Sequence, residues 1–556
     1  DRQIMKLLSL VSYFFVSSCS LMAPSGATEQ SPNFIFILSD DQGWGTTSVK
    51  YDPSVPESRS DFFKTPNIES LAASGMRFTK AYAAHPNCSP SRASIQTGRS
   101  PAALHLTDIV DRNPGIIKKC PHPGMREICD LGLKKCRGGK KQLCKNNTSD
   151  LSLQKIQKKI DSFYFGNKVL PPIHIEDLPF EEKTIAELLK EHNPRYSTAH
   201  FGKWHLMGGG PSEHGYDNSD GVIGNAEGSL SENLPNNPKR AFSITNSAVS
   251  WLKQKVIEGR PFYLQLSHFA VHKTAQSRPK TIDYFISREK GARHADTLFA
   301  AMLYDMDESI GLLLSAVKDA GIEDNTYIIF TSDNGTYSSI DNSSSANGPI
   351  RGYKDQLFEG GLRVPFIFSG PGIPANAISK EPVIAWDILP TIMDLANRKS
   401  WPQVVEGGSL KPLLLSKAQK VSRPFDGLVF HYPHYNYVLE KRRIEVQRPS
   451  SAIIYDGWKL LYTWETGSSS LFNIDDDIGE TKDLAKNEQL KTAYLKNKLM
   501  MYLNMVEAQI PRNNAEYNPS EDPLRKGSYS LQRELMLFHK NKAPQLQQKR
   551  KTKNTM

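Results

Sequence analysis

Four short apolar runs limit most strongly what this chain can fold into. Each has the pattern of a strand that is buried on both faces of a sheet. They are Asn33–Leu38, Thr198–Phe201, Pro261–Leu266 and Thr326–Phe330. Amphipathic helix patterns lie between them, one from Thr184 and a longer one from Ala295 to a terminating Gly321. This alternation predicts an α/β fold with a large domain whose mostly parallel central sheet is flanked by helices.

The sequence pattern changes after about residue 420. The segments "SAIIYDGWKLLYTW" and "SSLFNID" are typical of antiparallel strands joined by turns, and a helical pattern follows them. We therefore predict a large domain over 32–420 and a smaller C-terminal α+β subdomain with an antiparallel sheet over 421–515. The polar, basic residues 516–556 are predicted to form a disordered tail.

Residues 1–31 have the pattern of a signal peptide and leader. Lys6 precedes the apolar run "LLSLVSYFFVSS", which is too short to span a bilayer comfortably. Cleavage is expected near Ala27, or at Cys19 in a pattern that resembles a bacterial lipoprotein box and would add a lipid anchor. We expect an exported protein, periplasmic or extracellular, with no transmembrane segment.

The cysteines and the net charge agree with export and with an anionic partner. One short segment without a C-x-x-C pair contains Cys120, Cys129, Cys136 and Cys144. In an oxidising compartment this favours two disulfides over a zinc site, with the pairing left open. The segment is also rich in Lys and Arg, and the whole chain has a formal charge of +10. Because no nucleic-acid-binding motif is present, we expect no nucleic-acid partner.

Oxygen-bearing side chains follow two of the predicted strands where each strand ends. Asp40 and Asp41 follow the first strand, and Asp333 and Asn334 follow the last. Ligand sites in open parallel sheets form beyond the carboxyl ends of strands, so we expect these side chains to meet. Adjacent carboxylates repel each other unless a cation lies between them, and these oxygen donors suit one Ca²⁺ ion, or Mg²⁺, better than zinc. The alternative is that each pair only forms a turn.

The other two strands are followed by basic and histidine side chains. Lys203 and His205 occur in "GKWH", and His268 and His272 occur in "SHFAVH". Four strand ends that all supply charged or metal-binding groups predict a functional site at this edge of the sheet.

An isolated cysteine, Cys88, precedes a predicted helix in "NCSPSRASIQTGR". Ser89 is a good N-cap, Pro90 suits the first turn, and Gly98 is a helix stop. The helix N-terminus and the nearby Arg92 favour an anion and predict a low pKa for the Cys88 thiol. A buried inert cysteine is the alternative, but it leaves the neighbouring oxygen donors and basic groups unexplained.

This stretch resembles the C-x-P-x-R signature of the formylglycine-dependent sulfatases. Five further segments occur in that family's order: "NFIFILSDDQGWG", "AHFGKWHLMG", "PFYLQLSHFAVH", "FTSDNG" and "GYKDQLFEGGLRVP". The resemblance extends from about Asn33 to Pro365. It implies an alkaline-phosphatase-like fold, a catalytic domain over 32–420, and oxidation of Cys88 to formylglycine by dedicated cellular machinery that reads C-x-P-x-R.

The resemblance also implies a role for each site residue. Cys88 would become the aldehyde whose hydrate is the nucleophile and a metal ligand, and Arg92 resembles the group that holds the hydrate. His272 or a neighbouring lysine would protonate the leaving alcohol, and His205 would act as a base. His268 has no clear counterpart and is expected to be structural. The Ca²⁺ ligands would be Asp40, Asp41, Asp333 and Asn334, and the sulfate-binding and proton-transfer set would be Lys203, His205, His272 and Lys354.

The sequence thus predicts a sulfatase, a hydrolase that releases inorganic sulfate from sulfuric esters, with a sulfated carbohydrate as the expected substrate. Two alternatives are a phosphonate or phosphate ester hydrolase of the same superfamily and a non-catalytic protein that binds sulfated glycans. The segment "FHYPHYN" (Phe430–Asn436) could contact a sugar or form a packed aromatic cluster. The particular ester, exo or endo action and the oligomeric state are not predicted.

Overall fold

The computed structural model describes residues 31–110 and 167–520, except 176, 231–233, 338–346, 399, 401–403 and 441–442. All elements below belong to the unit Pro32–Met556. The predicted signal segment with Cys19 and Ala27, the basic segment with Cys120, Cys129, Cys136 and Cys144, and the predicted tail after residue 520 lie outside the described residues. Within the described residues, no helix is long and apolar enough to cross a membrane.

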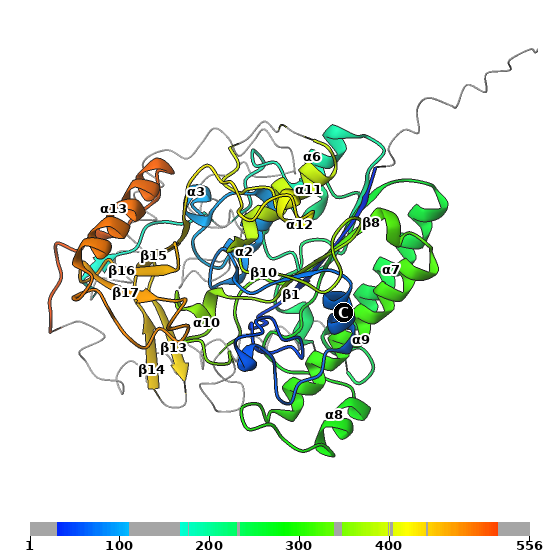
Figure 1. Ribbon diagram of the computed structural model, residues 1–556, viewed down its shortest axis with the longest axis horizontal. Helices are drawn as coiled ribbons and strands as arrows, with labels where there is room; N and C mark the ends of the chain where they lie inside the picture. The colour runs from blue at the N-terminus through cyan, green and yellow to red at the C-terminus, as the bar shows by residue number, and fades with distance from the viewer. Residues whose placement is uncertain are drawn as a thin grey trace, which may run out of the picture. The chain divides into compact units, whose positions relative to one another are not determined.

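An eight-stranded sheet forms the centre of the large domain (Figure 1). In spatial order its strands are β10 (Ala377–Ser379), β2 (Met76–Phe78), β9 (Phe366–Ser369), β8 (Thr326–Ser332), β1 (Asn33–Ser39), β7 (Phe262–Ser267), β5 (Ser197–Gly202) and β6 (Asn218–Ser219). The four predicted strands are the adjacent strands β8, β1, β7 and β5, and they run parallel. Because β9 runs antiparallel to β8 and β2, the sheet is mixed but mostly parallel, as predicted.

Strand β1 shows how the sheet is buried on both faces. Phe34, Phe36 and Leu38 pack in one apolar core with helices α2 (Cys88–Thr97), α6 (Ile185–His192) and α11 (Ile388–Leu395). Ile35 and Ile37 pack in a second core with α1 (Pro66–Ala73), α7 (Ala241–Ile257), α8 (Pro279–Ile286) and α9 (Thr297–Asp319). Successive side chains of a strand point to opposite faces, so the continuous apolar run supplies both cores. The helices therefore flank the sheet, as predicted.

Both predicted helices form, the first from Thr184 and the second up to the expected stop at Gly321. Thr184 and Glu187 form a reciprocal capping box at the start of α6, and Asp296 accepts a hydrogen bond from the Phe299 amide at the start of α9. Gly321 follows α9 with a φ of 63°, a conformation that glycine adopts without strain. The shorter helices are α3 (Pro101–Leu104), α10 (Glu359–Leu362) and α12 (Lys411–Leu414).

A separate antiparallel sheet follows in the C-terminal part. Its strands, in spatial order, are β12 (Leu428–Tyr432), β15 (Ser450–Tyr455), β16 (Trp458–Thr463) and β17 (Ser468–Asn473). Helix α13 (Gln489–Met505) packs on this sheet, with Leu495 and Leu499 in one core with Ile453 and Leu460. The smaller antiparallel sheet is thus confirmed, whereas the boundary at residue 421 stays a prediction. Two-stranded pairs complete the fold: β13 (Asn436–Glu440) with β14 (Arg443–Gln447), β3 (Ala81–Tyr82) with β11 (Val383–Ile384), and β4 (Val169–Leu170) with β18 (Arg512–Asn513).

Candidate active site

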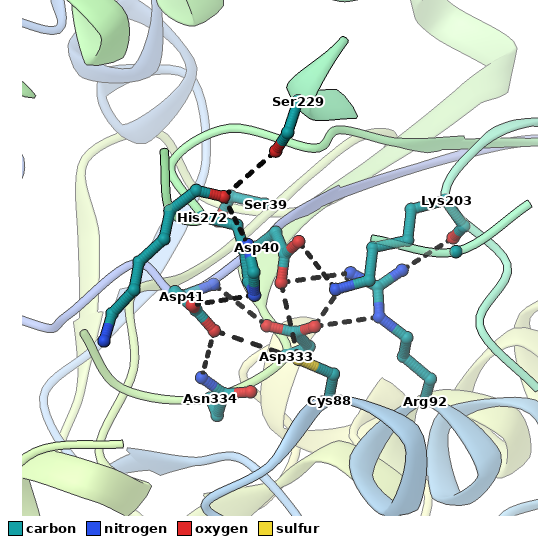
Figure 2. Close-up of polar contacts among 12 residues, drawn as sticks. Ser39, Asp40, Asp41, Cys88, Arg92, Lys203, Ser229, His272, Asp333 and Asn334 are labelled. Atoms are coloured by element: carbon teal, nitrogen blue, oxygen red, sulfur yellow. Dashed lines mark hydrogen bonds and ion pairs between the residues drawn. The ribbon is translucent and has the colours of Figure 1, made fainter. Parts of the chain in front are cut away.

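The carboxyl ends of β1 and β8 place the predicted oxygen donors together (Figure 2). Ser39 pairs with Ser332 in the parallel register, so the residues that follow each strand are neighbours. The Asp41 amide donates to Asp333 Oδ1 at 3.1 Å, and Asn334 Nδ2 donates to Asp41 Oδ1 at 2.7 Å. One oxygen each of Asp40, Asp41 and Asp333 and the Cys88 sulfur all lie within 4.8 Å of one another. The predicted meeting of these side chains is therefore observed.

The donor set fits a hard divalent cation. Asp41 Oδ2 and Asn334 Oδ1 are buried and have no hydrogen-bond partner among the described residues. Buried polar atoms without a partner destabilise a fold, so unsatisfied oxygens beside two further carboxylates indicate a missing electropositive ligand. Carboxylate and amide oxygens suit Ca²⁺ or Mg²⁺. These residues could therefore hold the predicted ion.

Three basic side chains approach the three carboxylates. Lys203 Nζ lies 2.7 Å from Asp40 Oδ2, and Lys354 Nζ lies 2.6 Å from Asp41 Oδ1. Arg92 donates from Nε to Asp333 Oδ2 at 2.8 Å, and its Nη2 lies 2.8 Å from the same oxygen. All these side chains are nearly or fully buried. Burial strengthens each attraction, because the surrounding medium screens the charges less than water does.

The neighbouring charges set the protonation states of the site. Burial alone would raise the pKa of Asp40, but Lys203, followed by His272 and Arg92, lowers this pKa to about 2. Burial likewise opposes ionisation of Asp41, and Lys354 outweighs it, so the pKa of Asp41 is also lowered. The pKa of Lys354 is raised well above its usual value, because the attraction of Asp41 exceeds the effect of burial. These groups are therefore charged at neutral pH.

Cys88 is the first residue of α2, and its side chain faces the carboxylates. Its Sγ lies 3.2 Å from Lys354 Nζ, 3.6 Å from Asp40 Oδ1 and 3.9 Å from Asp41 Oδ1. The expected N-cap was wrong by two residues, since Asn87 precedes the helix, while the stop at Gly98 is confirmed. The predicted low thiol pKa was also wrong. Burial raises the pKa of Cys88 to about 12, against the opposing effect of the lysines.

Arg92 connects three of the segments that form the site. In addition to its contacts with Asp333, it donates from Nη1 to the Lys203 backbone carbonyl at 2.7 Å. This side chain therefore connects helix α2 with the residues that follow β8 and β5. A planar guanidinium group can make such directed contacts in several directions at once, which a lysine cannot.

The two predicted histidines lie beside these charges, His205 buried and His272 partly exposed. His272 Nδ1 lies 2.7 Å from the Lys273 carbonyl oxygen, and its Nε2 lies 3.8 Å from Asp41 Oδ2. A carbonyl oxygen only accepts, so Nδ1 carries a proton and Nε2 faces the site. Burial lowers the pKa of His272 to about 4, and burial and Lys203 lower the pKa of His205 well below its usual value. Both rings are therefore predominantly neutral at pH 7.

Two residues near His272, Lys239 and Ser229, were not predicted from the sequence. Lys239 Nζ donates to Ser229 Oγ at 3.3 Å and to the Lys273 carbonyl at 3.1 Å. Burial lowers the pKa of Lys239 to about 8. Neither residue belongs to a motif or follows a predicted strand, so the sequence contained no signal for them. His268, expected to be structural, is fully buried.

The aromatic segment Phe430–Asn436 forms part of the packed interior. His431, Tyr432, His434 and Tyr435 are all buried. Tyr432 packs edge-on against His85. His431 donates from Nε2 to the Gln509 carbonyl, and its Nδ1 forms a hydrogen bond with Ser451 Oγ. Of the two interpretations of this segment, the structure favours the packed aromatic cluster.

Comparison with known proteins identifies the family. The family model for sulfatases matches residues 32–124 and 145–398. The chain belongs to the sulfatase family. A curated N-acetylgalactosamine-6-sulfatase of Canis lupus familiaris is 29% identical over 75% of this chain and 71% of its own length. A curated sulfatase of Formosa agariphila is 26% identical over 92% of this chain and 95% of its own length.

Solved structures agree with this assignment at the level of the fold. The crystal structure of Ps i-CgsB superposes with a TM-score of 0.61 and 23% identity, covering 90% of this chain and 97% of that one. Together, the family match and the named relatives identify the protein as a sulfatase, an enzyme that hydrolyses sulfuric esters. The predicted family, fold class and enzyme class are thus confirmed.

Proposed function

We propose that this sulfatase uses formylglycine derived from Cys88 and one Ca²⁺ ion held by Asp40, Asp41, Asp333 and Asn334. The main supporting observation is the Cys88 side chain, fully buried at the start of α2, with its sulfur facing two of these carboxylates. With a pKa of about 12 the unmodified thiol is protonated at neutral pH and would be a poor nucleophile. When present, formylglycine supplies a hydrated carbonyl with two hydroxyl groups, and Ca²⁺ supplies positive charge for the sulfate oxygens.

The basic side chains explain how the site accepts an anion. A sulfate ester carries negative charge and resists attack by an anionic nucleophile, so the site must neutralise charge around sulfur. Lys203 and Lys354 are buried, and each forms an ion pair with one of the carboxylates near Cys88. In this proposal the two lysines bind the sulfate oxygens. Arg92 holds helix α2 against the residues that follow β8 and β5.

The histidines supply proton transfer. His272 presents Nε2 to the site, where the ring can take up a second proton from solvent. Nε2 then gives this proton to the leaving alcohol when the S–O bond breaks, and the ring returns to its neutral Nδ1–H form. His205 is a neutral, buried ring beside Lys203, and its Nδ1 has no hydrogen-bond partner among the described residues. It is suited to accept a proton during sulfate release.

We propose a sulfated carbohydrate as the substrate of an exported enzyme. Support comes from the formal charge of +10 and from relatives whose names specify a sulfated amino sugar. Among structures of the same fold, Ps i-CgsB was crystallised with k-i-k-neocarrahexaose, and another, BT4656, with D-glucosamine-2-N,6-O-disulfate. Export, periplasmic or extracellular, is supported by the N-terminal signal pattern, and the predicted processing machinery would act on C-x-P-x-R during biosynthesis.

The proposal is tested with protein from a host that makes formylglycine. Mass spectrometry of the peptide containing Cys88 should show replacement of the thiol by an aldehyde. Sulfate release should be measured on a panel of sulfated oligosaccharides and on matched aryl sulfate and aryl phosphate esters, with Cys88→Ala as the inactive control. An unmodified thiol in active protein would refute the proposal that formylglycine is the nucleophile. A faster aryl phosphate reaction would refute the preference for sulfate, and inactivity on every sugar sulfate would refute the substrate class.

A further inference from the structure

Three donors converge on one backbone carbonyl beside His272. The Lys273 carbonyl oxygen lies 2.7 Å from His272 Nδ1, 3.1 Å from Lys239 Nζ and 3.2 Å from Ser229 Oγ. The contacts from His272 and Ser229 are drawn in Figure 2. Ser229 ends the short helical turn η4 (Glu227–Ser229), and Lys239 lies in a second one, η6 (Pro238–Arg240). Residues from two separate segments therefore fix the chain directly after His272.

Lys239 holds this part of the chain at two points. Its ammonium group binds the Lys273 carbonyl, and its backbone amide donates to Gln276 Oε1 at 3.0 Å. Gln276 Nε2 in turn donates to the Leu230 carbonyl at 3.1 Å. The segment from His272 to Gln276 is thus joined to both helical turns by direct hydrogen bonds.

The environment of Lys239 is unusual for a lysine with only a packing role. Its side chain is 1% exposed, and the described residues provide it with no carboxylate partner within ion-pair distance. Burying an ammonium group without a counter-ion is unfavourable, and here burial lowers its pKa to about 8. Its hydrogen bonds are instead directed to Ser229 and to the carbonyl that binds His272. A methionine of similar shape would fill the same space without this unfavourable burial.

We propose that Lys239 is a positioning residue that orients His272 through the Lys273 carbonyl. A fixed carbonyl keeps the proton of the neutral ring on Nδ1 and keeps Nε2 directed toward the reacting ester. The inference rests on the proposed role of His272, in which the ring first takes up a proton from solvent at Nε2. Nε2 then gives this proton to the leaving oxygen as that oxygen takes the electron pair of the breaking S–O bond, and the ring returns to its neutral Nδ1–H form. Without Lys239 the carbonyl and the ring can reorient, so proton transfer becomes slower.

Leaving-group dependence tests this role, because a structural defect does not distinguish between leaving groups. Lys239→Met should lower kcat roughly 10- to 100-fold for a sulfate ester of a weakly acidic alcohol, with KM little changed. It should have little effect on 4-nitrophenyl sulfate, whose acidic phenol leaves without a proton. His272→Asn should show the same selectivity, and the double variant should be no slower than His272→Asn alone. Lys253→Met, which changes an exposed lysine of helix α7, is the matched control.

A uniform loss on all esters, or additive effects in the double variant, would overturn the proposal. If the wild-type protein releases no sulfate, the proposed function fails, and the positioning role is then tested by NMR of ¹³C-labelled histidine. The His272 signal, assigned by its absence in His272→Asn, should report the Nδ1–H form in the wild type and a mixture of forms in Lys239→Met. An unchanged spectrum would refute the inference. Ser229→Ala should give a smaller shift in the same direction if Lys239→Met does not fold.

Discussion

Lys459→Met should destabilise the protein, and more strongly at pH 8 than at pH 6. Lys459 Nζ lies 3.1 Å from Glu359 Oε1 and 3.0 Å from Glu480 Oε1, and all three side chains are fully buried. Glu359 begins α10, shortly after Lys354 in the sequence, whereas Lys459 lies on β16 of the C-terminal sheet. One buried cation therefore joins the C-terminal sheet to the segment that carries a site lysine.

The expected magnitude follows from the two carboxylates that lose their shared cation. Removing one partner of a buried ion pair typically destabilises a protein by about 3–5 kcal/mol, while methionine fills most of the lysine volume. Burial already raises the pKa of Glu480 to about 7, although Lys459 opposes this. When the pKa of a carboxyl is higher in the folded than in the unfolded state, the free energy of unfolding of the protein falls as pH rises from about 4.3 through 7. Without Lys459 the pKa of Glu480 rises further, so the variant loses additional free energy of unfolding mainly above pH 7.

Urea unfolding at pH 6 and pH 8 measures both parts of this prediction. We expect the free energy of unfolding of Lys459→Met to fall by about 3 kcal/mol at pH 6 and by roughly 1–2 kcal/mol more at pH 8. Lys486→Met, which removes an exposed lysine of the same C-terminal part, should change it by less than about 0.5 kcal/mol. A loss below about 1 kcal/mol, or the same loss at both pH values, would show that the cluster does not depend on this cation.

Three further predictions concern the site. Asp333→Asn should weaken Ca²⁺ binding at least about 10-fold by isothermal titration calorimetry, because it removes a charged ligand; unchanged affinity would exclude Asp333 as a ligand. Arg92→Lys should lower kcat roughly 100-fold or more in a sulfate-release assay, since lysine cannot contact Asp333 and the Lys203 carbonyl together; near-normal kcat would show that the connection is dispensable. In the absence of Ca²⁺, the lowered pKa of Asp40 should add about 2 kcal/mol to the free energy of unfolding above pH 4, and this contribution should be lost as pH falls toward 2. Asp40→Asn should remove this part of the acid dependence measured by urea unfolding.

The central strands were predictable because their burial leaves a local signal. A strand covered on both faces needs a continuous apolar run, and β1, β5, β7 and β8 all have one. The outer strands are short, and β6 has only the polar residues Asn218 and Ser219. Their pairing, and the antiparallel direction of β9, depend on contacts with distant segments, which no local pattern contains.

The site was predictable where its residues follow these strands directly. Asp40, Asp333 and Lys203 meet because parallel strands end at one edge of the sheet. Lys239 reaches the same region from a short helical turn, so only the folded structure brings it near His272. The thiol pKa was mispredicted for a similar reason, because the helix N-terminus is a local feature of Cys88 whereas its complete burial is not.

The balance of charge explains why the acidic and basic residues of the site depend on each other. Three carboxylates without the lysines and Arg92 would attract a cation but repel an anionic ester, and the basic groups alone would make burial of the site highly unfavourable. With three carboxylates and three cations in contact, the protein alone is close to neutral here. A bound divalent ion would then leave net positive charge facing the ester, in a buried environment where it acts most strongly. Loss of one carboxylate should therefore impair cation binding, whereas loss of one lysine should impair binding of the ester.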